Sequence, residues 1–214
     1  LRRVIREEKN GEITVIADNF NDKKLNSPND VAVSKLGNIW FTDPPYGILT
    51  NQEGHKSESE QDGNNLFMVD KDFKIKKINA KFDKPNGLAF SPNGKYLYVA
   101  DSGAANPGNF DLSRPHNIQV FELDDDENII SNKIFAEINN GFPDGMTVDV
   151  NGNLFVCDPN GKKIHIFEQS SDYIGNINIP ERVANCTFGG ENKSDLYITA
   201  STSLYRLKTL TQGL

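Results

Sequence analysis

The stretch Lys84-Pro85-Asn86-Gly87-Leu88-Ala89-Phe90 decides the fold, because two other segments of the chain repeat it. The matching segments are Ser27-Pro28-Asn29-Asp30-Val31-Ala32-Val33 and Phe142-Pro143-Asp144-Gly145-Met146-Thr147-Val148. Each segment is followed by a glycine-containing turn and an apolar run that ends on an aspartate, which is Asp43, Asp101 or Asp158. The Asn or Asp position recurs at an interval of about 57 residues, and a weaker fourth copy begins at Asn185. A fixed interval of this size predicts a repeat architecture.

Within each repeat the pattern is typical of β-structure. Short runs of Val, Ile, Phe and Tyr are bounded by Asn-Gly or Gly-Asn turns, and no window sustains helical periodicity. The strands that this pattern predicts lie near 87–91, 96–100, 118–123, 133–137, 145–149, 153–157, 163–168 and 173–178. Four antiparallel strands per repeat over several repeats predict an all-β fold, a β-propeller. A β-sandwich is the alternative, which the shared Pro-Asn/Asp start and the shared closing aspartate disfavour.

The two ends of the chain predict incomplete blades. Residues 2–6 and 12–17 resemble the outer two strands of a preceding blade, and the last repeat has three strands, near 184–188, 195–200 and 203–208. A propeller that closes its ring avoids open strand edges. We therefore expect residues 1–214 to form a single β-propeller domain with about four and a half blades present. The N-terminal blade and the inner strands of the next blade are expected to be missing.

Composition excludes several classes of partner. The chain has 23 Lys and Arg against 30 Asp and Glu, a net charge of −7, and no basic run. We therefore expect neither a nucleic-acid nor a membrane partner, because both need a basic or a long apolar surface. Two cysteines make no disulfide framework, and P-loop and Gly-x-Ser-x-Gly motifs are absent. The sequence leaves the oligomeric state open, and it does not separate a cytoplasmic from a periplasmic location.

The repeated Asn and Asp positions are candidate binding residues. The innermost strand of each propeller blade runs along the central channel, so equivalent positions at its start converge on one rim. Asn29, Asn86, Asp144 and Asn185 are therefore expected to surround one pocket. Their oxygen atoms suit a hard divalent cation such as Ca²⁺, Mg²⁺ or Mn²⁺. The alternative is that each side chain only caps its own turn by bonding to the backbone two residues on.

Other polar residues are weaker candidates for chemistry. The closing aspartates are expected to space the strands by accepting hydrogen bonds from backbone or Ser/Thr groups rather than to be catalytic. Asp101, beside Ser102, is the best candidate for a catalytic role among them. His165 lies in an alternating strand and is expected to be solvated. His55 and His116 lie in polar loops without the spacing of a zinc site.

Several motifs together resemble the gluconolactonase branch of the family that includes senescence marker protein, or regucalcin. The motifs are Leu25-Asn26-Ser27-Pro28-Asn29-Asp30-Val31, Trp40-Phe41-Thr42-Asp43-Pro44-Pro45-Tyr46-Gly47-Ile48, Pro85-Asn86-Gly87-Leu88, Phe142-Pro143-Asp144-Gly145-Met146 and Ala184-Asn185-Cys186-Thr187-Phe188-Gly189-Gly190. They cover essentially the whole chain in the family's order. The resemblance implies a six-bladed propeller with one divalent metal ion at the channel mouth, and hydrolysis of sugar lactones to aldonic acids.

The resemblance also implies roles for five residues. Asn86 and Asp144 match metal ligands, and Asp144 also matches the catalytic proton donor and acceptor. Asn29 matches a substrate contact close to the metal, and the motifs around Tyr46 and Asn185 add two further substrate-binding residues.

Two departures from the family pattern stand out. The family's third metal ligand is a glutamate in the first blade, for which this chain has no corresponding segment. Ser27 stands where some relatives carry a substrate-contacting arginine.

These implications predict a metal-dependent lactone hydrolase of the gluconolactonase type, active in carbohydrate metabolism. Ca²⁺ is the first choice of metal, with Zn²⁺, Mg²⁺ and Mn²⁺ as alternatives, and a sugar lactone is the expected partner. One alternative keeps the fold and hydrolyses other lactones or esters. Another is a non-catalytic propeller that binds a protein or peptide over its channel face, which would favour apolar rather than Asn and Asp residues at the strand starts.

Overall fold

The computed structural model describes residues 2–106 and 109–214 of the chain. The chain divides into two compact units, residues 1–85 and residues 86–214, and each is described here by itself. In the described part, all regular elements are strands except one short helix, α1 (Tyr46–Leu49). None of the helical structure in residues 2–106 and 109–214 is long and apolar enough to cross a membrane.

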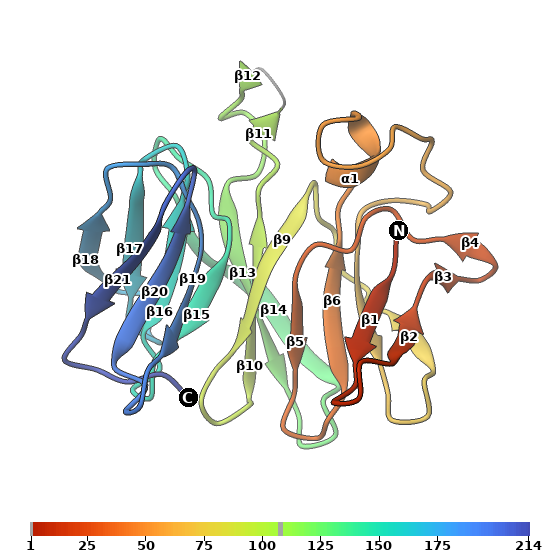
Figure 1. Ribbon diagram of the computed structural model, residues 1–214, viewed down its shortest axis with the longest axis horizontal. Coiled ribbons are helices and arrows are strands. Elements are labelled where there is room, and N and C mark those ends of the chain that lie inside the picture. The colour runs from red at the N-terminus through yellow and green to blue at the C-terminus, as the bar shows by residue number, and fades with distance from the viewer. Residues whose placement is uncertain (1, 107–108) are drawn as a thin grey trace. The chain divides into compact units, whose positions relative to one another are not determined.

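The first unit is built around one four-stranded antiparallel sheet (Figure 1). Its strands follow chain order as β5 (Val31–Val33), β6 (Ile39–Asp43), β7 (Asn65–Val69) and β8 (Ile75–Lys77). Two further pairs precede it, β1 (Val4–Glu7) with β2 (Ile13–Ala17), and β3 (Asn19–Phe20) with β4 (Lys23–Lys24). Leu25, Phe41 and Phe67 are fully buried in the core that joins the β1–β2 pair to this sheet. The Phe41 and Phe67 rings stack with centroids 5.3 Å apart.

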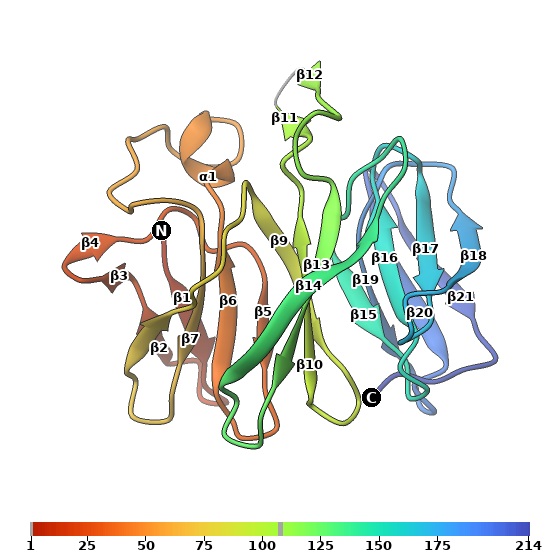
Figure 2. The ribbon, with the colours of Figure 1, turned by 180° about the vertical axis from the view of Figure 1, so that it is seen from behind.

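The second unit contains three successive antiparallel sheets. The first has β9 (Pro85–Phe90), β10 (Tyr96–Asp101), β13 (Asn117–Leu123) and β14 (Ile129–Glu137), and Figure 2 shows β14 beside β13. The second has β15 (Met146–Val148), β16 (Leu154–Asp158), β17 (Lys163–Phe167) and β18 (Tyr173–Asn178). The third has β19 (Val183–Gly189), β20 (Asp195–Ala200) and β21 (Leu204–Lys208). A small ribbon, β11 (Ala105–Asn106) with β12 (Asn109–Phe110), lies between β10 and β13 in the chain.

These sheets are the propeller blades that the repeats predict, so the all-β propeller prediction is confirmed. The strands expected from the sequence are all present, although β15 is shorter than the expected 145–149. The β3–β4 and β11–β12 ribbons and the helix α1 were not predicted. Elements of two to four residues are too short to give a periodic pattern, so sequence reasoning misses them.

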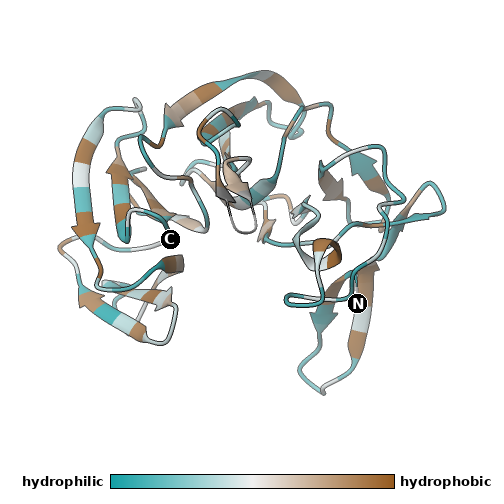
Figure 3. Ribbon diagram, turned by 90° about the horizontal axis from the view of Figure 1, so that it is seen from above, coloured by the Kyte–Doolittle hydropathy of each residue, from teal (hydrophilic) through white to brown (hydrophobic). Residues whose placement is uncertain are grey.

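Burial along the strands explains why their sequences differ. The second strand of a blade is covered on both faces, and all five residues of β16, Leu-Phe-Val-Cys-Asp, are buried. The outer strands are covered on one face only, so β14 and β18 are mostly exposed. Figure 3, coloured by the hydropathy of each residue, shows brown and teal bands along some of the strands. A continuous apolar run therefore marks a central strand and an alternating run marks an outer strand.

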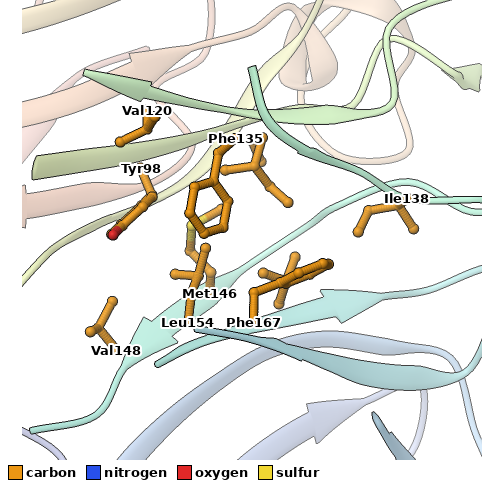
Figure 4. Packing of buried hydrophobic residues seen from close by; sticks show 11 residues of the cluster. Tyr98, Val120, Phe135, Ile138, Met146, Val148, Leu154 and Phe167 are labelled. Atoms are coloured by element: carbon orange, nitrogen blue, oxygen red, sulfur yellow. The ribbon is translucent and has the colours of Figure 1, made fainter. Parts of the chain in front are cut away.

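An apolar core joins the first two sheets of the second unit (Figure 4). Tyr98 and Phe135 come from the β9–β14 sheet, and Met146, Leu154 and Phe167 come from the β15–β18 sheet. The Phe135 ring makes edge contacts with Tyr98 at 4.9 Å and with Phe167 at 6.0 Å between centroids. Such edge contacts add to the stability that burial provides.

The closing aspartates accept backbone hydrogen bonds, as expected, and for Asp43 and Asp158 the donor lies in another segment. Asp43 Oδ2 accepts a hydrogen bond from the backbone N–H of Asn26 at 2.7 Å. Asp158 Oδ1 accepts from the N–H of Phe142 at 3.3 Å, so both carboxyls hold the segment that leads into a repeated Pro-Asn/Asp motif. Asp101 Oδ1 accepts from the N–H of Gly103 at 3.2 Å.

The prediction that His165 is solvated is wrong. The residue is 9% exposed and its Nε2 lies 3.3 Å from Asp158 Oδ2. Its ring also packs beside those of Phe167 and Tyr173, with centroids 6.2 Å and 5.8 Å away. The alternating pattern places His165 on the less apolar face of β17, but large neighbours cover that face.

The Asp43 carboxyl lies in an unusual environment. Its side chain is fully buried, and its Oδ1 has no hydrogen-bond partner among the described residues. Burial raises the pKa of Asp43 to about 7, against the lowering effects of the Asn26 and Ser27 N–H groups and the Arg2 charge. In the folded protein the Asp43 carboxyl is therefore mostly protonated at mildly acidic pH.

We expect two isoleucines in neighbouring strands to contribute differently to the free energy of unfolding, because their burial differs. Ile118 in β13 is fully buried, whereas Ile134 in β14 is 55% exposed. Ile118→Ala should lower the free energy of unfolding by about 2–5 kcal/mol, because it removes buried methyl groups and leaves a cavity. Ile134→Ala should change it by about 0.5 kcal/mol or less. Urea unfolding followed by circular dichroism measures both values, and equal losses would contradict the assigned core.

We expect Asp43 to make the protein less stable as the pH rises from about 4 to about 7. The folded carboxyl, with a pKa of about 7, keeps its proton in this range, whereas the unfolded carboxyl, with its ordinary pKa of 3.8, loses it. The folded state therefore binds more protons, so the unfolding free energy falls with rising pH and levels off above pH 7. The total change is up to about 4 kcal/mol at 1.36 kcal/mol per pKa unit.

The Asp43→Asn variant tests this expectation, because the amide cannot ionise. The stability of the parent relative to this variant should fall across the same pH range in urea titrations. Asp72→Asn, at a carboxyl whose side chain is 78% exposed, is the control. Parallel curves for the parent and Asp43→Asn would show that the buried carboxyl does not hold its proton.

Candidate functional site

Three of the predicted site residues lie on successive inner-strand starts in the second unit. Asn86 is the second residue of β9, Asp144 lies two residues before β15, and Asn185 is the third residue of β19. The N–H of Asp144 donates to the carbonyl of Cys157 in β16 at 2.9 Å. The N–H of the next residue, Gly145, donates to the carbonyl of Ala184 at 2.9 Å. The segment before β15 is thus bonded to its own blade on one side and to the next blade on the other.

Two glycines allow these strand starts to approach closely. A Cβ atom added at Gly87 would lie 2.3 Å from the carbonyl oxygen of Asp144. A Cβ atom added at Gly145 would lie 2.3 Å from Cγ of Asn185. Both distances are far below van der Waals contact, so a larger residue at Gly87 would clash with backbone, and one at Gly145 would displace the Asn185 side chain. The glycines after Asn86 and Asp144 therefore allow the close approach at these two strand starts.

Asn86 is held by a chain of hydrogen bonds. The residue is 6% exposed, and its Nδ2 donates to Ser102 Oγ at 3.1 Å. Ser102 is fully buried, and its hydroxyl donates to the carbonyl of Pro143, the residue before Asp144. This contact differs from a local turn cap, because the Asn86 amide reaches the end of the neighbouring strand β10.

Asn185 is more exposed and is held differently. A β-bulge between Val183 and Asn185 interrupts the pairing of β19 with β20, and a bulge redirects the side chain that follows it. Asn185 Oδ1 accepts the N–H of Cys186 at 2.8 Å, and the Asn185 carbonyl accepts from Thr199 Oγ1 at 3.2 Å. The Asn185 side chain therefore bonds to the backbone of the next residue. This resembles the alternative expectation, in which each Asn or Asp side chain only caps its own turn.

Two buried thiols lie next to this row of residues. Cys157 is bonded through its backbone to Asp144 and Gly145, and Cys186 follows Asn185. Both cysteines are free and buried. A hydrogen bond with Cys186, burial and the nearby Asp144 charge raise the pKa of the Cys157 thiol well above its usual value. The raised pKa favours the neutral thiol, which argues against an activated nucleophilic thiolate at Cys157.

Asn29 and Tyr46 lie in the first unit and line a pocket of about 850 Å³. The Asn29 N–H donates to the carbonyl of Thr42 at 2.9 Å, which fixes the backbone of this residue beside β6. Tyr46 is the first residue of α1. Ser27 Oγ donates to the carbonyl of Pro44 at 2.6 Å and accepts the N–H of Gly47 at 2.9 Å, so it ties this helix to the Asn29 segment.

The rest of the pocket wall carries charges of both signs. The charged lining residues are Arg2, Arg3, Asp18, Asp22, Lys24 and Glu53. Mixed charges around amide and hydroxyl groups suit a polar ligand rather than an apolar one.

The donor atoms of the second-unit site fit a hard divalent cation. Asn86, Asp144 and Asn185 provide amide and carboxylate oxygens, which Ca²⁺ and Mg²⁺ prefer. Residues 2–106 and 109–214 contain no cluster of three or more His, Cys, Asp or Glu side chains that could hold a metal. Amide and carboxylate oxygens match Ca²⁺ better than Zn²⁺, which prefers nitrogen and sulfur ligands.

Sequence reasoning missed the residues that organise this site. From the sequence, Ser102 is only a small neighbour of Asp101, and the glycines of the Asn-Gly motifs are expected only to form turns. The available signal was that Gly follows the polar residue at both 87 and 145, directly before an apolar strand. A glycine at a strand start often marks close approach of another backbone.

Comparison with known proteins places this geometry in a family. Residues 2–202 match the model of the SMP-30/Gluconolactonase/LRE-like region. The gluconolactonase of Zymomonas mobilis is 37% identical over 210 residues, which covers 94% of this chain and 55% of that protein. The chain therefore spans a little over half the length of this curated relative.

Solved structures agree with this assignment. A gluconolactonase from Xanthomonas campestris matches with a TM-score of 0.83 and 31% identity, covering 97% of this chain and 65% of that chain. Regucalcin from Agrobacterium tumefaciens, a calcium-binding protein, matches with a TM-score of 0.72 and 18% identity, covering 95% of this chain and 68% of that chain. The second match supports the fold alone. On the family match and the gluconolactonase relatives, the chain belongs to the SMP-30/gluconolactonase/LRE-like family.

Proposed function

We propose that the protein hydrolyses sugar lactones to aldonic acids at a divalent cation held in part by Asn86 and Asp144. The observation that supports this proposal is the row of Asn86, Asp144 and Asn185 at the starts of successive inner strands, two amides and one carboxylate. Membership of the family and the two gluconolactonase relatives support lactone hydrolysis as the reaction class. Ca²⁺ is the proposed cation, because the donors are oxygens and the family includes a calcium-binding regucalcin.

In the proposed reaction, water attacks the lactone carbonyl carbon and the bond from that carbon to the ring oxygen breaks. A bound divalent cation would polarise the carbonyl and lower the pKa of a bound water. Asp144 accepts the proton of the attacking water on its carboxylate and returns it to the ring oxygen as the ring opens. The product is an open-chain hydroxy acid, so no redox partner is required.

Asn and Tyr side chains are proposed to bind the sugar. Asn185 Oδ1 already accepts a backbone N–H, so its Nδ2 is the group that can donate to a sugar oxygen. Asn29 and Tyr46 are proposed as substrate contacts from their place in the pocket wall of the first unit. The third metal ligand, which the family resemblance implies to be a glutamate, stays a prediction.

We expect Asp144→Asn to lower kcat for gluconolactone by at least about 100-fold, because positioned acid–base groups contribute about 10²–10⁴-fold. A pH-stat assay, corrected for spontaneous lactone opening, measures the rate. Asp126→Asn changes an exposed aspartate in the second unit and should keep the parent rate. Thermal unfolding of each variant checks that the fold is retained.

Chelation tests the cation separately from the proton transfer. EDTA should abolish the catalysed rate and added Ca²⁺ should restore it. A rate insensitive to EDTA would contradict the metal, and an active Asp144→Asn variant would contradict the assigned acid–base residue. If no rate above background is found with gluconolactone, the same assay with other lactones and esters tests the alternative substrates.

A further inference from the structure

We infer that Ser102 is a positioning residue that turns the amide oxygen of Asn86 toward the proposed cation site. The inference rests on the proposed function, because the cation itself belongs to that proposal. The Ser102 side chain is fully buried, so it is out of reach of a substrate in the channel. It would therefore act through Asn86.

The argument follows from the hydrogen-bonding capacity of a hydroxyl. A serine hydroxyl has one proton to donate and two lone pairs that accept. Ser102 donates that proton to the carbonyl of Pro143, which can only accept. Toward Asn86 the hydroxyl must therefore act as acceptor, so Asn86 has to present its NH₂ group.

This requirement removes the usual ambiguity about the two ends of an asparagine amide. The oxygen and nitrogen of an amide are nearly the same size, and only the surrounding hydrogen bonds decide their orientation. With Nδ2 bonded to Ser102 Oγ at 3.1 Å, Oδ1 points away from Ser102. An amide coordinates a cation through its oxygen and not through its nitrogen, so a flipped Asn86 would not serve as a ligand.

The same hydroxyl also joins the two proposed ligands. Its acceptor, Pro143, immediately precedes Asp144, and the Gly87 backbone lies against the Asp144 carbonyl. The hydrogen-bonded chain from Asn86 through Ser102 to Pro143 therefore fixes the spacing of the β9 and β15 strand starts. Residues that orient metal ligands in this way typically change metal affinity about 10–100-fold when they are replaced.

Three variants of the purified protein test the inference. Ser102→Ala removes both hydrogen bonds, and Ser102→Thr keeps the hydroxyl. Ser91→Ala is the matched control, because Ser91 is 2% exposed, lies at the opposite end of the β9–β10 hairpin and also makes two hydrogen bonds. Calcium affinity by isothermal titration is one readout. The exchange rate of the Asn86 side-chain NH₂ protons by NMR, assigned with Asn86→Asp, is the second.

Ser102→Ala should weaken calcium binding about tenfold or more and speed Asn86 NH₂ exchange by a similar factor. Ser91→Ala should leave both within about twofold, and Ser102→Thr should restore both if it folds. Unchanged NH₂ exchange or unchanged affinity in Ser102→Ala would overturn the inference. If the parent binds no calcium while NH₂ exchange still depends on Ser102, the proposed metal centre fails and the orientation of Asn86 stands.

Discussion

The close approach of inner-strand starts in the second unit depends on two positions that have no side chain. At Gly87 and Gly145 the next strand start lies where a Cβ atom would be. A methyl group at Gly87 would push against the Asp144 carbonyl, which is backbone and cannot rotate away. At Gly87 the neighbour is backbone, and at Gly145 it is the side chain of Asn185. The closeness of the strand starts that carry the proposed site residues is therefore an outcome of blade packing.

Hydrogen bonds at the ends of the central strands hold the loops that carry the polar residues. Asp43 and Asp158 each accept a backbone N–H from the segment before a repeated Pro-Asn/Asp motif. The Asp43 carboxyl is fully buried, so ionising it costs free energy unless its hydrogen bonds compensate. Asp43 retains an unpaired oxygen among the described residues, which explains the direction of its pKa shift. Similar aspartates in one repeat pattern thus have different environments, because the groups around each carboxyl differ.

The repeats predicted the blades and the row of strand starts because both follow from a period in the sequence. Asn86, Asp144 and Asn185 could be placed on successive strands without any knowledge of side-chain contacts. Contacts that depend on packing could not be predicted in this way. The burial of His165 is decided by Phe167 and Tyr173, and the role of Ser102 depends on a carbonyl 41 residues further along the chain. Neither relationship leaves a local pattern.

The Ser27 hydroxyl gives the first unit a different kind of constraint. It bonds both to Pro44 and to Gly47, and a Cβ atom added at Gly47 would lie 2.9 Å from Ser27 Cβ. Residue 27 and the course of residues 44–47 are therefore coupled. An arginine at this position would have no acceptor for the Gly47 N–H, so residues 44–47 would need another contact to keep this course. Substitutions at position 27 can therefore reshape this pocket wall without changing the sheet beneath it.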